Sequence, residues 1–434
     1  MTKGPAKSFP RLAFGGKVLG SGNIALMPSS TVLLSEHGSL FGSPQPYFFK
    51  LHHLKKQLSG SELHGRGGAA FPLSRKLAGY EPYRGKLIVV ANGSEGECLS
   101  RKDEQLIARH PHLVLDGLSI LGSALDAKAG YVHVKASKTS SQRILQEALL
   151  ERAGLDPFRI EISLTASEVG YVAGSESAVV SAINHQGGLP IYLPDRPMAR
   201  GVKKRPTLIA NVETLAHLAL LARFGSDWFS SIGSAGDSGT RLLTVSLPNR
   251  SSGVVEVVAG TEFSEIFEVL GVSRSQISCG LLGGYFGQLV DIDKLWSLRA
   301  SHAFLKEAGF SFGAGVVALA DGCPVAEISA ILEYLAGESA GQCGPCYMGL
   351  PELAKTWREL VSGRVNSNSL SRIADLCDQI SGRGGCAMPD GAVLLARTAL
   401  SRFRPELLSH QSASCNYPGL SSSLVPPVTA LAGR

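Results

Sequence analysis

The chain has 434 residues, 44% of them apolar and 18% charged, which is typical of a well-packed protein of roughly two to four domains and excludes a long disordered tract. Its formal net charge of +6, from 42 basic and 36 acidic residues, is a mild excess spread along the sequence, so we expect no nucleic-acid binding but allow a basic face toward an acidic protein. No segment approaches the roughly 18 uninterrupted apolar residues of a membrane span, and Pro10 and Pro28 break any signal-peptide core, so the expected location is cytoplasmic.

Residues 1–50 are rich in Gly, Ser and Pro and are expected to form a variable N-terminal segment. Strand-like and helical patterns then alternate within residues 51–235. The expected elements are a strand at Leu87–Ala91, a helix at Ile107–Asp126, a strand at Gly130–Val134, a helix at 141–153 and a strand at Arg159–Leu164. This alternation predicts a parallel sheet with right-handed crossovers. A further apolar helix, Leu215–Phe224, has Asn211 as its expected N-cap.

The pattern changes at about residue 240. Arg241–Leu247 and Gly253–Val258 alternate as a hairpin does, and the helix Thr261–Leu270 and glycine-broken strands follow, so residues 240–318 are expected to form a small β-grasp domain. Residues 321–410 are expected to form a bundle of four helices, at Val325–Ala336, Leu350–Val361, Ser369–Ile380 and Ala392–Phe403. Residues 411–434 are Ser/Pro-rich and are expected to be a frayed tail. The predicted fold class is therefore α/β, with a β-grasp domain and a C-terminal four-helix bundle.

The most informative stretch is Gly65–Pro72 (GRGGAAFP). Its glycines allow positive φ and remove Cβ atoms, so successive N–H groups can converge on a phosphate, while Arg66 and Lys76 add positive charge nearby. Alone, this pattern is equally consistent with a turn that carries solvated basic residues. A second polar loop, Asn92–Glu97 (NGSEGE), directly follows the apolar strand, where open α/β sheets place ligands. The two loops together predict a site for an anionic cofactor.

Glu176 lies in a third segment, Gly174–Ser177 (GSES), at an expected strand-to-helix junction. A carboxylate there can accept a hydrogen bond from a sugar hydroxyl or an amide. It can equally lie in the first turn of a helix, where the macrodipole favours negative charge. The residues alone leave both readings open.

Cys343 and Cys346 are separated by two residues in the loop between the first two bundle helices, and Cys386 lies in the loop before the last helix. A two-residue spacer lets two thiolates face one metal centre, and neighbouring glycines leave room for inorganic sulfide. Three thiolates are one short of a four-cysteine cluster or a structural zinc site, and ordinary buried thiols are the alternative. The other cysteines are expected to be buried apolar side chains, with the last two as reserves for a missing ligand: Cys98, Cys279, Cys323, Cys377 and Cys415.

These segments, in this order, resemble the NADH-oxidising flavoprotein subunit of respiratory complex I and its relatives in hydrogenases and formate dehydrogenases. The resemblance covers about residues 55–400 and rests on GRGGAAFP (65–72), Lys76, NGSEGE (92–97), GSES (174–177), RPTLIANVET (205–214), GAGVVALAD (313–321) and ESAGQCGPC (338–346) with Cys386. It implies a Rossmann-like FMN-binding domain, a β-grasp (SLBB-like) domain and a helical bundle that holds a 4Fe-4S iron–sulfur cluster. In that family NADH gives a hydride to FMN, and single electrons leave through the cluster.

The resemblance also implies roles for individual residues. Contacts with the flavin are implied for Gly65, Arg66, Gly67, Gly68, Lys76, Asn92, Ser94, Glu95, Gly174, Asn211 and Thr214. Contacts with NADH are implied for the catalytic acids Glu97 and Glu176, with the ring of Phe71 near the adenine. Cluster ligation is implied for Cys343, Cys346 and Cys386.

The sequence departs from the family pattern at several positions. Ala340 replaces the first cluster ligand, and because a methyl group cannot bind iron, a cluster needs Ser339, another Cys or a non-protein ligand, or holds three irons. Three positions of the flavin and NADH segments carry replacements, at Ser94, Ser175 and Ala210. Groups that hold NADH in the family are replaced at Gly79, Leu193 and Arg196. FMN binding is therefore better preserved than NADH binding.

From these observations we predict an NADH dehydrogenase-like flavoprotein that accepts a hydride from NADH on FMN and passes electrons to a ferredoxin-like or other iron–sulfur protein. One alternative is an FMN electron-transfer module that exchanges electrons with a ferredoxin-like partner without NADH. Another is a non-catalytic scaffold protein that has lost its cofactors.

Overall fold

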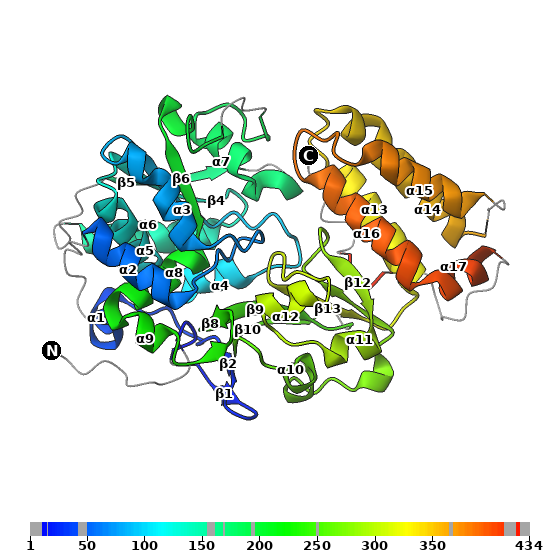
Figure 1. Ribbon diagram of the computed structural model, residues 1–434, viewed down its shortest axis with the longest axis horizontal. Coiled ribbons are helices and arrows are strands. Elements are labelled where there is room, and N and C mark those ends of the chain that lie inside the picture. Colours follow the sequence, from blue (N-terminus) through cyan, green and yellow to red (C-terminus); the bar gives the residue numbers. More distant parts are fainter. Residues whose placement is uncertain are drawn as a thin grey trace. The chain divides into compact units, whose positions relative to one another are not determined.

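A computed structural model describes residues 11–14, 16–41, 50–153, 161–167, 170–191, 196–248, 251–363, 368–411 and 422–425 (Figure 1). The chain divides into two compact units. The first consists of Met1–Leu243, Val254–Thr261 and Arg299–Phe304, and the second of Thr244–Gly253, Glu262–Leu298 and Leu305–Arg434. In the described part of the chain, no helix combines the length and apolar character needed to cross a membrane.

The first unit is built around a four-stranded parallel sheet. Its strands lie in the order β5 (Ile162–Ser167), β4 (Ala129–Lys135), β3 (Ile88–Asn92) and β6 (Thr207–Asn211). The predicted parallel pairing is confirmed, and the last expected strand runs three residues further than its pattern indicated. Residues 154–160, where that strand was expected to begin, lie outside the described residues. Because Asn92 and Asn211 pair in register, β3 and the edge strand β6 end side by side.

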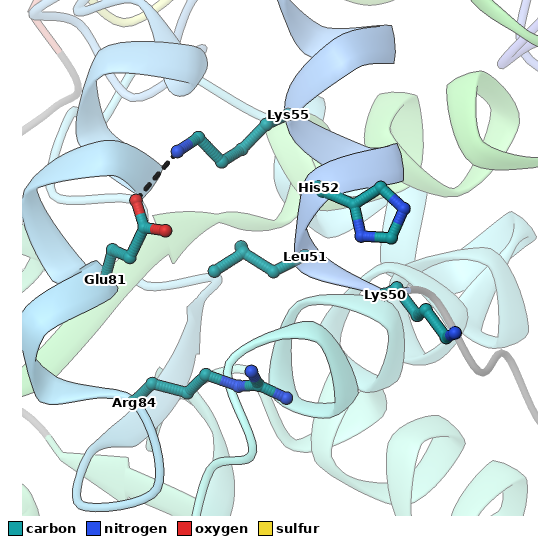
Figure 2. A pocket seen from close by; sticks show the side chains of 6 residues that line it. All are labelled: Lys50, Leu51, His52, Lys55, Glu81 and Arg84. Carbon is teal, nitrogen blue, oxygen red and sulfur yellow. Dashed lines mark hydrogen bonds and ion pairs between the residues drawn. The ribbon is translucent and has the colours of Figure 1, made fainter.

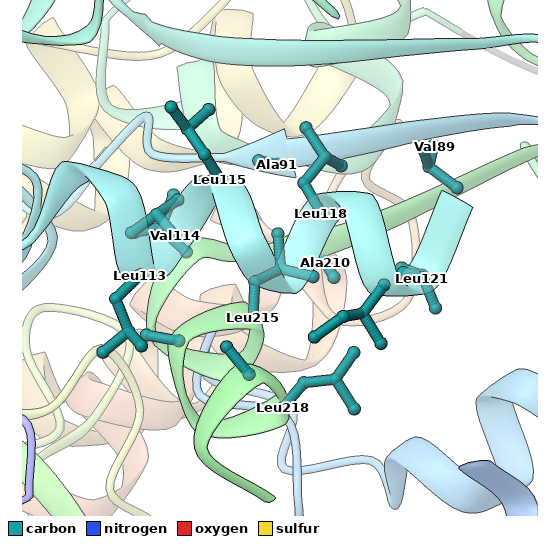
Figure 3. Close-up of a cluster of buried hydrophobic side chains, with 14 of the residues drawn as sticks. Val89, Ala91, Leu113, Val114, Leu115, Leu118, Leu121, Ala210, Leu215 and Leu218 are labelled. Carbon is teal, nitrogen blue, oxygen red and sulfur yellow. The ribbon is translucent and has the colours of Figure 1, made fainter. Parts of the chain in front are cut away.

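Helices accompany this sheet. They are α2 (Leu51–Ser61), α3 (Leu73–Tyr80), α4 (Lys102–Arg109), α5 (Pro111–Ala124), α6 (Thr139–Arg152), α7 (Glu176–Ile183) and α8 (Val212–Phe224). Helices α5 and α8 supply much of the apolar core beside the sheet. Gly117 of α5 lets α8 approach closely, since a Cβ there would lie 2.0 Å from the carbonyl oxygen of Leu215. Figure 3 shows the apolar side chains of α5 and α8 packed with Val89, Ala91 and Ala210 of the strands.

The long helix expected at Ile107–Asp126 is wrong, because two helices, α4 and α5, occupy this region. The break falls at His110, which has the non-helical dihedrals φ −132° and ψ 57°. Pro111 follows it, and proline has no N–H to continue a helix but fits the first position of a new one. The expected N-cap of α8 is confirmed, since the Asn211 side chain accepts from the N–H of Glu213.

The N-terminal segment is anchored in the first unit. Strand β2 (Ile24–Leu26) pairs antiparallel with both β1 (Val18–Leu19) and β10 (Ser252–Val258). The other elements of this unit are α1 (Leu34–Phe41), α9 (Ser226–Phe229), β7 (Gly233–Ser234) and β8 (Asp237–Ser238). Glu256 of β10 is fully buried and accepts the backbone N–H groups of Arg11, Leu12 and Ala13. Part of the segment expected to be variable is therefore fixed by a buried carboxylate.

The second unit begins with strands. In it, β13 (Val316–Ala320) pairs parallel with β9 (Thr240–Ser246) and antiparallel with β11 (Cys279–Leu282), which pairs with β12 (Gln288–Asp291). Short helices accompany these strands, at α10 (Phe263–Val269), α11 (Ile292–Ser297) and α12 (His302–Glu307). Strands β9 and β10 and helix α12 each have residues in both units.

The helical C-terminal region is confirmed. It contains α13 (Pro324–Gly337), α14 (Leu350–Val361), α15 (Ser369–Ile380), α16 (Met388–Arg402) and α17 (Arg404–Gln411). Buried Trp357 of α14 donates its indole N–H to the carbonyl of Val325 in α13, at 2.9 Å. Helix α16 begins before the expected Ala392, because Pro389 fits its first turn.

Part of the C-terminal tail is bound rather than frayed. Residues Ser422–Val425 lie against Glu327 of α13, whose carboxylate accepts the N–H groups of Ser423 at 2.8 Å and Leu424 at 3.2 Å. The Tyr285 hydroxyl donates to the Leu424 carbonyl at 2.7 Å, and the Leu424 side chain is buried. We call Ser422–Val425 the C-terminal strap. The rest of the tail, with Cys415, lies outside the described residues.

Candidate functional site

The glycine loop Gly65–Pro72 is closed on itself and packed against the end of β6. His64 and Pro72 form an isolated bridge, and the N–H of Gly65 donates to the Phe71 carbonyl at 2.9 Å. Gly68 has φ +112°, a conformation that side-chain-bearing residues rarely adopt. A Cβ at Gly67 would lie 3.3 Å from the Cβ of Asn211, so the loop backbone reaches the carboxyl end of the parallel sheet.

Arg66 anchors this loop to the interior of the first unit. Its backbone N–H donates to the hydroxyl of Thr214 at 2.8 Å, and its guanidinium is buried. The guanidinium donates to the Thr240 carbonyl at 2.9 Å and lies 3.8 Å from Asp237 and 4.0 Å from Glu213. The charge of Arg66 is thus balanced inside the protein, and the backbone of the loop forms its outer surface.

The second predicted loop, Asn92–Glu97, packs against the segment that contains Gly174. The Asn92 amide donates to the Gly174 carbonyl at 2.9 Å. A Cβ at Gly174 would lie 2.4 Å from the Ser94 carbonyl oxygen, and one at Gly96 would lie 1.9 Å from that of Tyr171. Both glycines are required by these close backbone approaches. Within the described residues the buried hydroxyl of Ser94 has no hydrogen-bond partner.

Lys76 of α3 joins β6 to α7. Its ammonium group donates to the Ile209 carbonyl at 2.6 Å and to the Glu176 carboxylate at 2.9 Å. Glu176 lies in the first turn of α7, which Ser175 caps by accepting from the N–H of Ala178. The first-turn reading of Glu176 is confirmed, and its side chain is half exposed beside Lys76, so contact with a ligand stays a prediction.

The remaining predicted acids and the aromatic residue occupy different surroundings. Glu97 is buried and accepts from the hydroxyl of Tyr171 and, at 3.2 Å, from the N–H of Leu99. Glu95 accepts the N–H groups of Asp103 and Glu104 at 3.0 Å each, and so caps the first turn of α4. The ring of Phe71 is exposed. Arg196 is described and exposed, whereas Leu193 lies outside the described residues.

A group of buried charges beneath the glycine loop was missed by sequence reasoning. Lys102 is 3.0 Å from Glu213 and also pairs with its neighbour Asp103, which accepts from the Asn211 amide. Burial alone would lower the pKa of Lys102, but Asp103 and Glu213 outweigh it and raise that pKa. Burial raises the pKa of Asp103 to about 7 against the opposite pull of Lys102. Lys102, Asp103, Glu213, Arg66, Asp237 and Arg241 are all at most 7% exposed.

This ion cluster could not be found by a sequence motif, because its members come from distant segments. The only local signal was Glu213, a charged residue inside the otherwise apolar start of α8. The cluster lies against the predicted site, since Arg66 belongs to both and Asn211 of the site donates to Asp103 of the cluster.

In the second unit, Cys343 and Cys346 lie together at the start of the helical turn Pro345–Gly349, with their sulfurs 3.5 Å apart. Burial acts to raise the pKa of Cys343, but hydrogen bonds from the N–H groups of Gly385 and Cys346 leave it below its usual value. Burial, together with the Cys343 thiol, raises the pKa of Cys346 to about 11. Burial and then the neighbouring Cys343 charge raise the pKa of Cys386, so the three predicted thiols share one electrostatic environment.

Cys377, a reserve ligand, does not join this group. It is fully buried in α15, and burial raises its pKa to about 11, with Arg397 and Asp378 as its charged neighbours. Among the described residues no three His, Cys, Asp or Glu side chains are arranged to hold a single metal ion. An iron–sulfur cluster binds each thiolate through a different iron, so it does not need that single-ion arrangement. Three thiols of one region are thus available as cluster ligands, and Cys377, the reserve thiol among the described residues, is not an electrostatic neighbour of any of them.

A separate cavity of about 460 Å³ lies in the first unit, away from every predicted site residue (Figure 2). Its lining is basic, but Lys55 and Glu81 neutralise each other across it at 2.7 Å. The lining residues are Lys50, Leu51, His52, Lys55, Glu81 and Arg84.

Two family models and the relatives found by comparison indicate the same protein family. The Nuo51 FMN-binding domain matches residues 58–220, and the NADH-ubiquinone oxidoreductase-F iron-sulfur binding region matches residues 326–410. The second F-type NADH-quinone oxidoreductase subunit (F 2) of Rhizobium meliloti (strain 1021) is 30% identical, over 81% of this chain and 86% of that protein. The F-type NADH-quinone oxidoreductase subunit of Mycobacterium tuberculosis (strain ATCC 25618 / H37Rv) is 28% identical, over 84% of this chain and 86% of that protein.

The fold is shared with solved structures. Two crystal structures of NAD+-reducing NiFe-hydrogenase, in the air-oxidised and H2-reduced states, match with a TM-score of 0.75 at 22% and 23% identity. The match covers 87% of this chain but only 66% and 65% of those chains. At this identity the similarity concerns the fold alone.

Proposed function

Because the chain belongs to the family of F-type NADH-quinone oxidoreductase subunits, we propose that it binds FMN, accepts a hydride from NADH on the flavin, and passes electrons to an iron–sulfur carrier. The observation that carries this proposal is the glycine loop against the end of β6, with the unpartnered Ser94 hydroxyl two residues after the adjoining end of β3. Open parallel sheets bind nucleotides at this edge. When bound, the flavin supplies the hydride-accepting ring and the single-electron chemistry.

The residues fit FMN in distinct ways. The backbone N–H groups of Gly67 and Gly68 have no Cβ atoms beside them and so suit a phosphate, whereas the N–H of Gly65 closes the loop on the Phe71 carbonyl, and the Lys76 ammonium adds positive charge. The Ser94 hydroxyl donates to the flavin. We assign the remaining flavin contacts to residues at the base of the site, namely Arg66, Asn92, Gly174, Asn211 and Thr214. Glu95 acts indirectly, because it caps the first turn of α4.

NADH is bound on the accessible side of the same site. Glu176 is half exposed beside Lys76, and we assign it and Glu97 to the dinucleotide. The exposed ring of Phe71 provides a stacking surface for the adenine. Gly79 has no side chain to extend that surface, which favours weak NADH binding.

The further assignments concern the protein's surroundings. A ferredoxin-like iron–sulfur protein is the proposed partner, since relatives are named as subunits of NADH-quinone oxidoreductases. The described cysteines are all free thiols, which supports work in the reducing cytoplasm. We retain residues 51–235, 240–318 and 321–410 as the flavin, β-grasp and cluster regions.

Anaerobic titration of the FMN-loaded protein with NADH, followed by flavin absorbance, tests this function. Bleaching by NADH is expected, whereas reduction only by a reduced ferredoxin would replace it with the electron-transfer alternative. Ser94→Ala tests the site, because its hydroxyl has no protein partner among the described residues to lose. We expect FMN affinity to fall roughly tenfold, the size of one hydrogen bond. Ser119→Ala, which loses only a helix hydrogen bond in α5, is the control and should not change FMN affinity. Equal FMN affinity in both variants would remove Ser94 from the site.

A further inference from the structure

The iron–sulfur region of this chain holds three thiols together and leaves one apart. Residues 326–410 contain Cys343, Cys346, Cys377 and Cys386. The sulfurs of the first two are 3.5 Å apart, and Gly385, the neighbour of Cys386, lies so close that a Cβ there would be 4.0 Å from the Cβ of Cys343. Cys377 is fully buried in α15 among other charged groups. A 4Fe-4S cluster takes four protein ligands, so this chain is one thiolate short.

The position that would complete the set is Ala340. Iron–sulfur proteins use cysteines separated by two residues, and Ala340 precedes Cys343 by that spacing in a loop that follows α13. A methyl group supplies no electron pair. The carboxylate that influences the pKa of Cys386 is that of Asp390, and it already accepts the N–H of Gly382 at 2.7 Å. Neither side chain supplies a fourth thiolate.

We propose that the cluster of this chain is held by the thiolates of Cys343, Cys346 and Cys386 alone, so that its fourth iron has no protein ligand and would carry water or hydroxide. This inference rests on the iron–sulfur part of the proposed function and is independent of NADH oxidation. An iron with an exchangeable oxygen ligand is a coordination site for small donors, and it is also the iron that the cluster loses first.

Loss of that iron can be written as a balanced step. On mild oxidation by ferricyanide, a 4Fe-4S cluster of charge 2+ gives a 3Fe-4S cluster of charge 1+, one Fe(II) ion and one electron, and ferricyanide accepts the electron to become ferrocyanide. The three thiolates remain bound to the three irons that stay. No thiolate bond breaks, because the departing iron has none.

Iron and sulfide analysis with electron paramagnetic resonance (EPR) tests the proposal on the full chain prepared without oxygen. We expect the iron content to fall from about four to about three per chain after one equivalent of ferricyanide, with the EPR signal of an oxidised three-iron cluster. Ala340→Cys supplies a fourth thiolate, so it should keep its iron and show no such signal. Cys377→Ala is the matched control and should behave as the unchanged protein.

Other outcomes overturn the inference in different ways. An unchanged protein that keeps four irons on oxidation has a fourth protein ligand, and if Asp390→Asn or Ser339→Ala then loses iron, the substituted residue is that ligand. Loss of iron binding in Cys377→Ala would make Cys377 a ligand. A preparation with FMN but without iron refutes the cluster while leaving NADH-dependent flavin bleaching to be judged separately. A preparation that holds the cluster but is not bleached by NADH refutes only the proposed reaction.

Discussion

The buried histidine of β4 gives a quantitative prediction for acid stability. His133 is 0% exposed, and its ring nitrogens contact the hydroxyls of Thr165 at 2.9 Å and Ser167 at 3.1 Å. Burial lowers the pKa of His133 from 6.5 to about 4. Because the folded-state value is the lower one, the unfolded chain binds protons more readily between these two pH values. Stability is therefore fully present above about pH 6.5 and is lost as the pH falls toward 4.

The magnitude follows from the two pKa values. At pH 5 the imidazole is almost fully protonated in the unfolded chain but only about one tenth protonated in the folded protein. The free energy of unfolding is then about 2 kcal/mol lower than at neutral pH from this group alone. Three other buried histidines of the first unit have lowered pKa values as well, at His110, His112 and His217. Acid should therefore destabilise this unit strongly.

His133→Gln isolates the contribution of one group. We expect the variant to be less stable at pH 7 because it loses packing, but to lose about 2 kcal/mol less than the unchanged protein between pH 7 and pH 5. Urea unfolding followed by circular dichroism at both pH values measures this difference. His185→Gln, at an exposed position, should show the pH dependence of the unchanged protein. An equal loss in the His133→Gln variant and the unchanged protein would refute the argument.

Two further predictions concern buried charge. Lys102→Met leaves two buried acids without their cation and should lower the free energy of unfolding by about 3–5 kcal/mol, whereas Lys138→Met, which breaks a surface pair, should cost less than about 1 kcal/mol in the same urea titration. Glu327→Gln removes the charged acceptor in α13 that binds the C-terminal strap Ser422–Val425. Hydrogen exchange of the strap should therefore speed up, and the free energy of unfolding should fall by about 1–3 kcal/mol. Glu333→Gln, on a more exposed part of α13, should change neither; an unaltered strap in the Glu327→Gln variant would contradict the anchoring.

Much of the framework could be predicted from local sequence. The run Leu87–Ala91 is apolar throughout and rich in branched residues, which is typical of a strand buried on both faces, and it forms most of β3. Helices α14 and α15 begin and end where expected, because each has a clear apolar stripe and is bounded by polar or glycine residues. The order of strands and helices also sufficed to predict the parallel sheet. At the carboxyl edge of this sheet, Gly67 of the glycine loop lies against Asn211 at the end of β6.

Features that depend on distant contacts were not predictable in this way. The strap was expected to fray because Ser-rich segments carry no periodic signal, and only the position of Glu327 reveals its anchor. The ion cluster combines Lys102, Glu213 and Asp237, which share no spacing or motif. The break between α4 and α5 was missed although Pro111 marked it, because the apolar pattern continues across it.

The structure argues against one of the two readings of the glycine loop. A turn with solvated basic residues requires Arg66 to face water, but its guanidinium is buried between Asp237, Glu213 and the carbonyl of Thr240. Burying an arginine costs several kcal/mol unless acids and hydrogen bonds compensate it, and here they do. The same residue gives its backbone N–H to Thr214, so the buried charge fixes the path of the loop. A loop held this firmly can present its N–H groups in one arrangement before any ligand arrives, which lowers the entropy cost of binding. This rigidity is of use to a protein that must grip an anionic cofactor and is unnecessary in a solvated turn.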